Sequence, residues 1–376
     1  MLSAQFFIDS LAAHGVDFFT GVPDSLLKNV CAYITDHFDA HHNIIAANEG
    51  AAVSLAAGYY LATRRIACVY MQNSGEGNAV NPLASLTDPE VYNIPLLLLI
   101  GWRGRPGVHD EPQHVKQGKV TTGLLNVMGI NYEVLSKEAE VASKQIEKAF
   151  ASMTVSNAPF ALVVEKDTFE NYMLQNKPAN DYPMSREQAI QMVASMLDPR
   201  AAIVSTTGMI SRELFEYRAA QGQDHRRDFL TVGSMGHASQ IALGIALQQP
   251  DRQVCCFDGD GAVIMHMGSL AVLAALQPHN LIHVVFNNGA HDSVGGQPTV
   301  GYKIDLPAVA LSLGYSQAVS VSTAEELQEF LPQILLAQGP VLIEIRVHRG
   351  NRPDLGRPTT TPQQNKEAFM NFLISE

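Results

Sequence analysis

Two groups of polar residues have the spacing of a divalent-cation site. Gly259-Asp260-Gly261 directly follows the apolar run 254–258, and Asn287-Asn288-Gly289 directly follows the run 281–286. Because both runs have the length of buried strands, we expect both polar groups at the carboxyl edge of one sheet. A carboxylate, an amide oxygen and a backbone carbonyl suit octahedral Mg²⁺, and glycines let a diphosphate approach the backbone. The pattern predicts a diphosphate held through Mg²⁺.

Other sites could be built on the same glycines. A dinucleotide-binding Gly-x-Gly-x-x-Gly would need glycine at Ile264, and no acid lies in the stretch 277–280. A P-loop fails because the only Gly-Lys pair, Gly118-Lys119, is followed by Val120. Gly-Asp-Gly alone is most often a turn, since Asp and Gly dominate turns. Both nucleotide-binding motifs are therefore excluded, and the simple turn stays open.

A carboxylate in apolar surroundings stands in the first half of the chain. Glu49 follows the apolar run 44–47 and precedes the small-residue segment 51–63, which is expected to be helical. Low polarity disfavours the charged form, so proton sharing by Glu49 is one interpretation. Complementing the positive end of the helix is the other.

Further candidates lie in loops. Asp24 stands where a helix is expected to open, so it is either a proton relay or a helix cap. Thr207-Gly208 follows the strand-like run 202–205 and could contact a diphosphate, whereas Met235 could be an ordinary core methionine. His109 and His114 are five residues apart with Pro112 between them, so they do not form a helical zinc site; an acid-base loop over a substrate is expected instead.

The elements that position these residues form two alternating strand–helix series, the first opened by a helix that Ser3 caps and the second by a helix from Ser185. Runs of strand length in the first half are 16–19, 44–47, 66–71, 95–100 and 160–164. Those in the second half are 202–205, 229–232, 254–258, 281–286 and 341–347. Strands that alternate with helices indicate parallel sheets covered on both faces. We therefore predict an α/β fold of two doubly wound parallel-sheet domains, 1–165 and 185–376, joined by a polar linker, 166–184.

Composition limits the class of protein. The chain has 376 residues and a net charge of -12, from 25 Lys plus Arg and 37 Asp plus Glu. An acidic surface repels phosphates, which argues against a nucleic-acid partner. The four cysteines form no C-x-x-C, no signal peptide is recognisable, and the apolar runs are too short to span a membrane. We expect a protein of the cytoplasm that does not bind membranes.

Taken together, the motifs resemble the phosphonopyruvate decarboxylases, a family of thiamine-diphosphate-dependent 2-oxo acid decarboxylases related to sulfopyruvate decarboxylase. Gly-Asp-Gly followed by Asn-Asn is the cofactor signature of thiamine-diphosphate enzymes, and the separation here, 288 − 260 = 28 residues, suits it. The second half of the motif makes a simple turn the weaker interpretation. The matching stretches are 21–27, 72–75, 77–82, 101–104, 106–114, 287–298 and 354–359.

The resemblance implies a role for each candidate. Mg²⁺ would be bound by Asp260, the amide oxygen of Asn288 and the backbone carbonyl of Ala290, although the adjacent Asn287 is an alternative ligand. Thiamine diphosphate would contact Thr207, Gly208, Gly259 and Gly261. Met235 would bend the cofactor, and Glu49 would exchange a proton with its aminopyrimidine ring. Asp24, His109 and His114 would act on the substrate, whose phosphonate has as cationic candidates Arg103, Arg105, Lys116, Arg352 and Arg357.

The resemblance also implies the reaction and the assembly. The expected reaction is decarboxylation of 3-phosphonopyruvate to phosphonoacetaldehyde and CO₂ in 2-aminoethylphosphonate-type biosynthesis. Sulfopyruvate or another 2-oxo acid is the alternative substrate, and a non-catalytic diphosphate-binding protein is a remote alternative. The first domain would bind the pyrimidine and the second the diphosphate, with no middle domain. The partner would be a second copy, in a dimer or dimer of dimers with active sites between subunits. Asn351 departs from the serine expected before Arg352.

Overall fold

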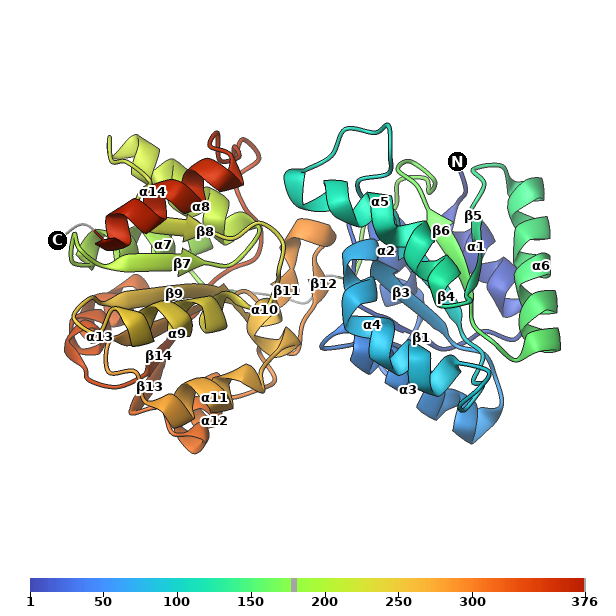
Figure 1. The fold of residues 1–376 in the computed structure, drawn as a ribbon, viewed down its shortest axis with the longest axis horizontal. Helices are drawn as coiled ribbons and strands as arrows, with labels where there is room; N and C mark the ends of the chain where they lie inside the picture. The colour runs from blue at the N-terminus through green and yellow to red at the C-terminus, as the bar shows by residue number, and fades with distance from the viewer. Residues whose placement is uncertain (177–180, 375–376) are drawn as a thin grey trace. The chain divides into compact units, whose positions relative to one another are not determined.

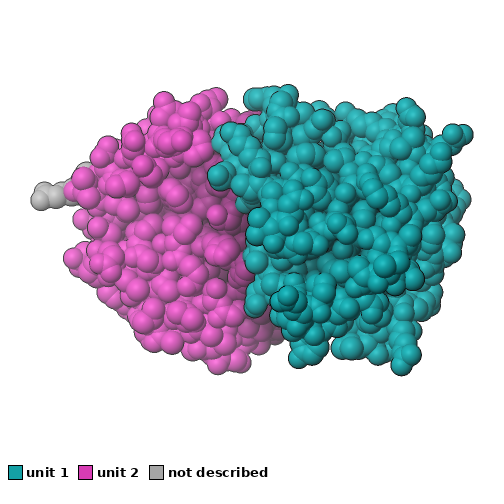
Figure 2. Space-filling view, turned by 45° about the vertical axis from the view of Figure 1, so that its right-hand side comes forward, with its two compact units in different colours: residues 1–177, 293–297 teal, residues 178–292, 298–376 magenta. Residues whose placement is uncertain are grey.

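The computed structural model describes residues 1–176 and 181–374. The chain divides into two compact units, which Figure 2 colours separately. Unit 1 comprises Met1–Lys177 and Ser293–Gln297, and unit 2 comprises Pro178–Asp292 and Pro298–Glu376. Within the described ranges, no helix is both long enough and apolar enough to cross a membrane.

The core of unit 1 is a six-stranded parallel sheet in the order β2-β1-β3-β4-β6-β5 (Figure 1). Its strands are β1 Phe19–Gly21, β2 Asn43–Ile45, β3 Cys68–Gln72, β4 Leu97–Gly101, β5 Asn131–Val134 and β6 Phe160–Val164. Along β3, Cys68 and Tyr70 enter one apolar cluster, and Val69 and Met71 enter another. The strand is therefore buried on both faces, which explains its continuous apolar run.

Helices cover both faces of this sheet. One face packs against α1 Ala4–Ala12, α2 Lys28–His37 and α6 Ala139–Ser156. The other packs against α3 Glu49–Thr63, α4 Glu76–Pro82 and α5 Pro112–Val127, with the short turns η1 Asn73–Gly75 and η2 Leu83–Thr87 on either side of α4. Ser3 caps α1 by accepting a 3.1 Å hydrogen bond from the backbone of Phe6, as expected.

Unit 2 is built on a second six-stranded parallel sheet, in the order β13-β14-β10-β9-β7-β8. Its strands are β7 Ala202–Ser205, β8 Asp228–Leu230, β9 Val254–Gly259, β10 Leu281–Asn287, β13 Gln317–Val321 and β14 Val341–Arg346. Helices α7 Arg186–Met196, α8 Met209–Ala220 and α13 Ala324–Leu336 pack on one face. Helices α9 Ala238–Gln248, α10 Asp260–Met265, α11 Ser269–Leu276, α12 Leu306–Leu313 and α14 Pro362–Ile374 pack on the other. The short elements β11 Ala290–His291, η3 Asp292–Val294 and β12 Gln297–Pro298 lie outside this sheet.

The two sheets have the same chain path. In each, the strands taken in chain order lie in the sequence second, first, third, fourth, sixth, fifth. The direction of winding therefore reverses between β1 and β3 in unit 1, and between β7 and β9 in unit 2. In doubly wound sheets, ligands bind at this switch point, outside the carboxyl ends of the strands. The functional side chains should accordingly follow these four strands.

The predicted α/β class with two parallel sheets is confirmed, but some elements differ. The first strand is Phe19–Gly21 and not 16–19, and α2 begins at Lys28 and not near Asp24, because residues 24–27 form a turn. The edge strands β5 and β13 were missed, because edge strands are only partly buried and lack a continuous apolar run.

The proposed linker 166–184 lies partly outside the described residues, which omit 177–180. Its beginning packs on unit 1: Phe169 is buried in the core, and the backbone of Leu2 donates to the carbonyl of Thr168 at 2.8 Å. The hydroxyl of Tyr172 donates to Asp36 at 3.0 Å.

Candidate active site

Asp24 and Gln72 lie together at the switch point of unit 1. The side-chain amide of Gln72 donates to Oδ1 of Asp24 at 2.6 Å, and the backbone N–H of Leu26 donates to Oδ2 at 2.8 Å. Asp24 is fully buried, and a side chain at Gly101 would overlap with its carboxyl group. The bond from Leu26 is that of a local turn cap. The proton-relay role of Asp24 stays a prediction.

Glu49 is the first residue of α3, and a residue of another helix of unit 1 donates a hydrogen bond to its side chain. Asn48 caps α3 by accepting a 2.9 Å hydrogen bond from the backbone of Ala51. The Glu49 side chain is buried, and its Oε2 accepts a 2.7 Å hydrogen bond from the side-chain amide of Asn78. A Cβ at Gly75 would overlap with the carboxyl group. The carboxyl group is thus fixed inside the unit, and its proton-exchange role stays a prediction.

A second carboxyl group of unit 1, that of Glu76, is also buried. The side chain is 3% exposed, and neither oxygen makes a hydrogen bond of normal geometry within the described part of the chain. Burial raises the pKa of Glu76 to about 8, and the nearby Thr121 hydroxyl opposes the shift. Glu76 is therefore mostly protonated at neutral pH. No pattern in the sequence pointed to this group.

The histidine loop of unit 1 is organised by Asp110. Its carboxylate accepts from Nε of Arg103 at 2.8 Å and contacts Nδ1 of His114 at 2.9 Å, and Arg103 also donates to the Ser25 hydroxyl at 2.6 Å. Burial alone would raise the pKa of Asp110, but the bonds from Arg103 and His114 hold it well below its usual range. Burial lowers the pKa of His114, against the opposing effect of Asp110. His109 lies on the exposed part of the loop. The two histidines therefore have different surroundings, and Asp110 was not singled out from the sequence.

In unit 2, Asp260 lies at the carboxyl end of β9 and is 2% exposed. The Thr299 hydroxyl and the backbone N–H of Asn288 donate to its carboxylate. Burial raises the pKa of Asp260 to about 6, although these bonds oppose the shift. No arginine, lysine or histidine among the described residues forms an ion pair with it. The structure thus brings Asp260 and Asn288 together, as the motif predicted.

The two adjacent asparagines have different partners. The amide of Asn287 donates to the Gly301 carbonyl at 2.9 Å and to Glu344 at 2.6 Å, and its Oδ1 accepts from the backbone of Gly289 at 3.0 Å. Asn287 is therefore committed to the fold on both sides of its amide. Oδ1 of Asn288 accepts from the backbone of Ala290 at 3.1 Å. Each Oδ1 thus accepts one backbone hydrogen bond, but Asn287 is fully buried and its amide nitrogen is held by two acceptors, so Asn288 stays our predicted metal ligand.

The loops after β7 and β8 contain the other residues of unit 2 that we predicted to contact the diphosphate. Gly208 has a φ of +105° and immediately precedes α8, and the Thr207 hydroxyl accepts a 3.1 Å hydrogen bond from the backbone of Gly233. Backbone N–H groups at the start of a helix suit a diphosphate. Met235 is half-buried, and its methyl group lies near Gly261, where an added Cβ would be 3.5 Å away. The oxygen donors and the helix start therefore fit a diphosphate bound through a hard cation.

Another polar cluster of unit 2 lies on the neighbouring strands β9 and β10. Cys256 and Asp258 on β9 and His283 on β10 have possible ligand atoms within 4.8 Å of one another. His283 pairs with Cys256 across the strands, and Asp258 is two residues further on, so all three project from one face of the sheet. A thiol and an imidazole are softer ligands than Mg²⁺ prefers. The predicted magnesium site therefore stays with Asp260 and Asn288.

Several cationic candidates for the phosphonate already have acidic partners. Arg105 pairs with Glu165 at 2.9 Å, and Arg352 pairs with Glu187 and Asp354 at 3.0 and 3.1 Å and also contacts Glu216. Lys116 is exposed on α5. The sequence could not distinguish these side chains, because their partners are distant along the chain.

Comparison with known proteins identifies the family. Residues 1–124 match the N-terminal TPP binding domain of thiamine pyrophosphate enzymes, and residues 206–345 match their C-terminal TPP binding domain. Phosphonopyruvate decarboxylase from Streptomyces hygroscopicus is 34% identical over 388 residues, which cover 99% of this chain and 94% of the relative. The chain belongs to the phosphonopyruvate decarboxylase family of thiamine pyrophosphate enzymes. The expected cofactor and enzyme class are therefore confirmed.

This family is related to the sulfopyruvate decarboxylases. The enzyme from Methanosarcina acetivorans is 26% identical, over 97% of this chain and 96% of its own. The sulfopyruvate decarboxylase β subunit from Methanothermobacter thermautotrophicus is 38% identical over only 45% of this chain, which is 84% of that subunit. This β subunit therefore corresponds to about half of the present chain.

Proposed function

We propose that this chain decarboxylates 3-phosphonopyruvate to phosphonoacetaldehyde and CO₂, with thiamine diphosphate and Mg²⁺, in phosphonate biosynthesis. The observation that carries the proposal is the buried Glu49, which Asn78 fixes at the start of α3. A protein that only bound the diphosphate would not need this carboxylate. The similarity to phosphonopyruvate decarboxylase over almost the whole chain supports the choice of substrate.

Unit 2 would hold the diphosphate end of the cofactor. Asp260, Asn288 and the carbonyl of Ala290 would bind Mg²⁺, and the loop Thr207-Gly208 would donate backbone N–H groups to the phosphates. Gly259 and Gly261 leave room beside Asp260, and Met235 would support the bend between the two rings. The cofactor supplies the electron sink that lets the carboxyl group leave as CO₂.

Unit 1 would supply the protons. Glu49 would share a proton with the aminopyrimidine ring, which prepares the cofactor for the reaction. Asp24, His109 and His114 are our candidates for proton transfer to the product carbon. Lys116, which is exposed on the helix that carries His114, is a candidate for the phosphonate.

We also propose that the protein works in the cytoplasm as a homodimer or a dimer of dimers, with each active site between two subunits. Glu49 and Asp260 belong to different units of one chain. The resemblance to thiamine-diphosphate enzymes supports pairing of unlike units from two copies. The many alanines of α3, such as Ala51 and Ala52, suit close packing at such an interface.

The deciding experiment is release of CO₂ from phosphonopyruvate by the purified protein, with and without thiamine diphosphate and Mg²⁺. Pyruvate and sulfopyruvate serve as comparison substrates, and kcat/KM is the quantity to compare. Cofactor-dependent release that is fastest with phosphonopyruvate is expected. Faster release from sulfopyruvate would replace the substrate and keep the cofactor assignment. No release from any of the three would favour a diphosphate-binding protein without activity.

A further inference from the structure

Three side chains that can bind a metal meet on one buried face of the sheet in unit 2. Cys256 and Asp258 are two residues apart on β9, and His283 lies opposite Cys256 on β10. All three are fully buried, and their possible ligand atoms lie within 4.8 Å of one another. The pairing of two strands therefore assembles a thiol, a carboxyl group and an imidazole in one place.

Two atoms of this cluster lack hydrogen bonds although they are buried. Within the residues that the structure describes, neither Oδ2 of Asp258 nor Nε2 of His283 makes a hydrogen bond, and the two atoms lie 3.4 Å apart. Oδ1 of Asp258 accepts from the backbone of Gly259 at 3.0 Å, and Nδ1 of His283 lies 3.4 Å from the Tyr315 hydroxyl. The atoms without partners are thus the two that face into the cluster, where burial without a partner is costly.

The 3.4 Å separation fits a shared metal ion better than a shared proton. A hydrogen bond between an imidazolium and a carboxylate is about 2.7–2.9 Å long. Tetrahedral zinc binds nitrogen and oxygen at about 2.0–2.2 Å, which places two such ligand atoms about 3.3–3.5 Å apart. A proton on Nδ1 of His283, facing the Tyr315 oxygen, would leave the lone pair of Nε2 for the metal.

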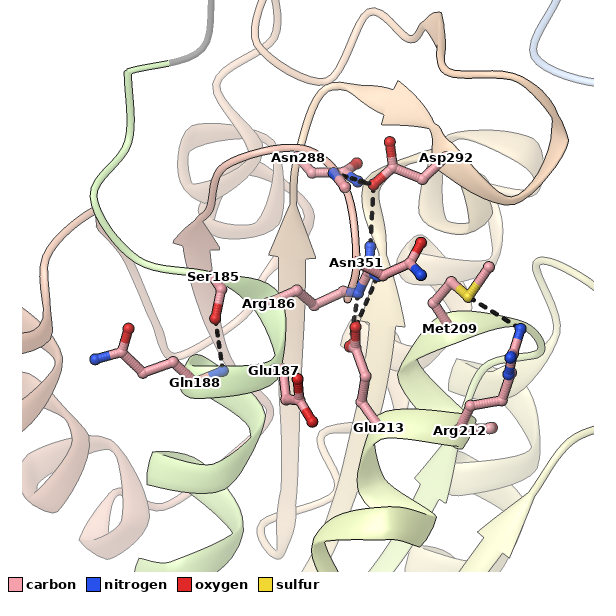
Figure 3. A network of polar contacts seen from close by, with 12 residues as sticks. Ser185, Arg186, Glu187, Gln188, Met209, Arg212, Glu213, Asn288, Asp292 and Asn351 are labelled. Atoms are coloured by element: carbon pink, nitrogen blue, oxygen red, sulfur yellow. Dashed lines mark hydrogen bonds and ion pairs between the residues drawn. The ribbon is translucent and has the colours of Figure 1, made fainter. Parts of the chain in front are cut away.

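The buried charges of another cluster in unit 2 are paired directly. Arg186 is 5% exposed and donates through Nε and Nη2 to both oxygens of Glu213, each at 2.8 Å, and through Nη1 to Asp292 at 3.3 Å (Figure 3). In contrast, no arginine or lysine among the described residues forms an ion pair with Asp258. A buried carboxylate of this kind calls for a cation that is not a side chain.

The ligand types select the metal. Thiolate and imidazole ligands suit Zn²⁺ and related transition metals, whereas Mg²⁺ prefers oxygen ligands. With Cys256 and Asp258 ionised and His283 neutral, the three ligands carry a charge of −2, which a divalent ion balances. The thiol proton is released to solvent when the metal binds.

We propose that Cys256, Asp258 and His283 form a second metal site, which holds a divalent transition metal such as Zn²⁺ and is separate from the Mg²⁺ site at Asp260. A water molecule would take the fourth position of the tetrahedral ion. The ion would join β9 to β10, the strands that precede the proposed cofactor ligands, so its role is structural. The site does not rest on the proposed reaction, because it is tested by metal binding and not by turnover.

The experiment measures which metal the whole protein contains. Because the ligands are fully buried, the ion must enter as the chain folds, so the protein is produced in cells grown with added Zn²⁺ or Co²⁺. It is purified without a histidine tag, in thiamine diphosphate and Mg²⁺. Metal per chain is measured by mass spectrometry, and the Co²⁺ form is examined by absorption spectroscopy. We expect a stoichiometric transition metal and the charge-transfer absorption of a thiolate bound to cobalt.

Adjacent cysteines provide the variant and its matched control. Both are fully buried on β9, but Cys256 enters the apolar cluster on one face of the sheet and Cys255 the cluster on the other. In Cys256→Ser we expect loss of the charge-transfer absorption and of the bound metal. Cys255→Ser should keep both. His283→Gln should also lose the metal, because it removes the imidazole.

Two outcomes would overturn the inference. A wild-type protein without stoichiometric Zn²⁺ or Co²⁺ would do so even if the variants fail to fold, and Asp258 and His283 would then be a buried pair without a metal. Equal metal content in Cys256→Ser and Cys255→Ser would show an adventitious ion only, bound elsewhere. Failure of CO₂ release would count against the proposed reaction and leave this site standing.

Discussion

The side-chain amide of Asn78 on α4 donates a 2.7 Å hydrogen bond to Oε2 of Glu49 on α3. This bond holds the side chain in place. A glutamine could keep a similar position but could not exchange the proton as a carboxyl group does. We therefore expect Glu49→Gln to fold normally, to bind thiamine diphosphate, and to lose roughly 10²- to 10⁴-fold in the rate of CO₂ release, the usual contribution of a positioned acid or base. Turnover and cofactor affinity should be measured on the same preparation.

The matched control for this variant is Glu147→Gln, on the exposed face of α6 in the same unit. It should keep wild-type turnover. Full activity of Glu49→Gln would remove Glu49 from the mechanism.

Gly75 leaves space that the Glu49 carboxyl group occupies. A Cβ there would overlap with the carboxyl group, whereas a Cβ at Gly77, two residues further on, would meet no atom within 4 Å. We expect Gly75→Ala to displace Glu49 and to reduce kcat by about 10²-fold, the effect of a misplacement of roughly 1 Å, and Gly77→Ala to be nearly silent. Steady-state kinetics of both variants tests this. Equal kcat values would show that the position of Glu49 tolerates displacement.

Two inactive variants can reveal whether active sites form between subunits. If each site combines Glu49 of one copy with Asp260 of the other, a hybrid of Glu49→Gln and Asp260→Asn chains contains one site with both native residues. Random mixing of dimers should then restore about one quarter of wild-type activity, because half of the dimers are hybrids with one working site. The mixture is assayed after dissociation and reassociation, with each variant treated alone as the control. No recovery, despite hybrids seen by mass spectrometry, would place both residues of a site in one chain.

Glu76 should make the stability of unit 1 depend on pH. Burial raises the pKa of its carboxyl group from 4.5 to about 8. Between these values the folded state binds a proton that the unfolded state has lost, so the free energy of unfolding falls as pH rises from about 4.5 to 8. Glu76→Gln should remove this fall and stabilise the protein above pH 8 by at least about 1.4 kcal/mol, the free energy of one pKa unit.

Unfolding midpoints from pH 5 to 9 provide the measurement for Glu76, with Glu147→Gln as the control. Parallel curves for wild type and Glu76→Gln would mean that Glu76 is ionised without cost in the folded protein.

The sequence predicted those parts of the site that lie directly after strands. Asp260 and Asn288 follow β9 and β10, so their local spacing alone placed them at one edge of the sheet. The choice between Asn287 and Asn288 could not be made from the sequence, because it depends on Glu344, 57 residues away. The bond from Arg186 to Asp292 was hidden for the same reason, since the two residues are 106 apart in the sequence.

The edge strands show a similar limit for the fold. Val134 and the other residues of β5 are at most partly buried, so the strand lacks the apolar run that identified β6. In unit 1, Asp110 stood inside a motif that was recognised, but its bonds to Arg103 and His114 depend on how the loop folds back.

The common strand order of the two sheets bears on how this enzyme arose. Two sheets with the same path, each with its switch point between the first and third strands, are what tandem duplication of one unit would produce. The two copies differ in what they carry, since the proposed acid Glu49 lies in one and the proposed metal ligand Asp260 lies in the other. The sulfopyruvate decarboxylase β subunit from Methanothermobacter thermautotrophicus aligns with 45% of this chain over 84% of its own length. Substitutions that alter the proposed proton transfer and the proposed metal binding would therefore arise in separate copies of the same chain path.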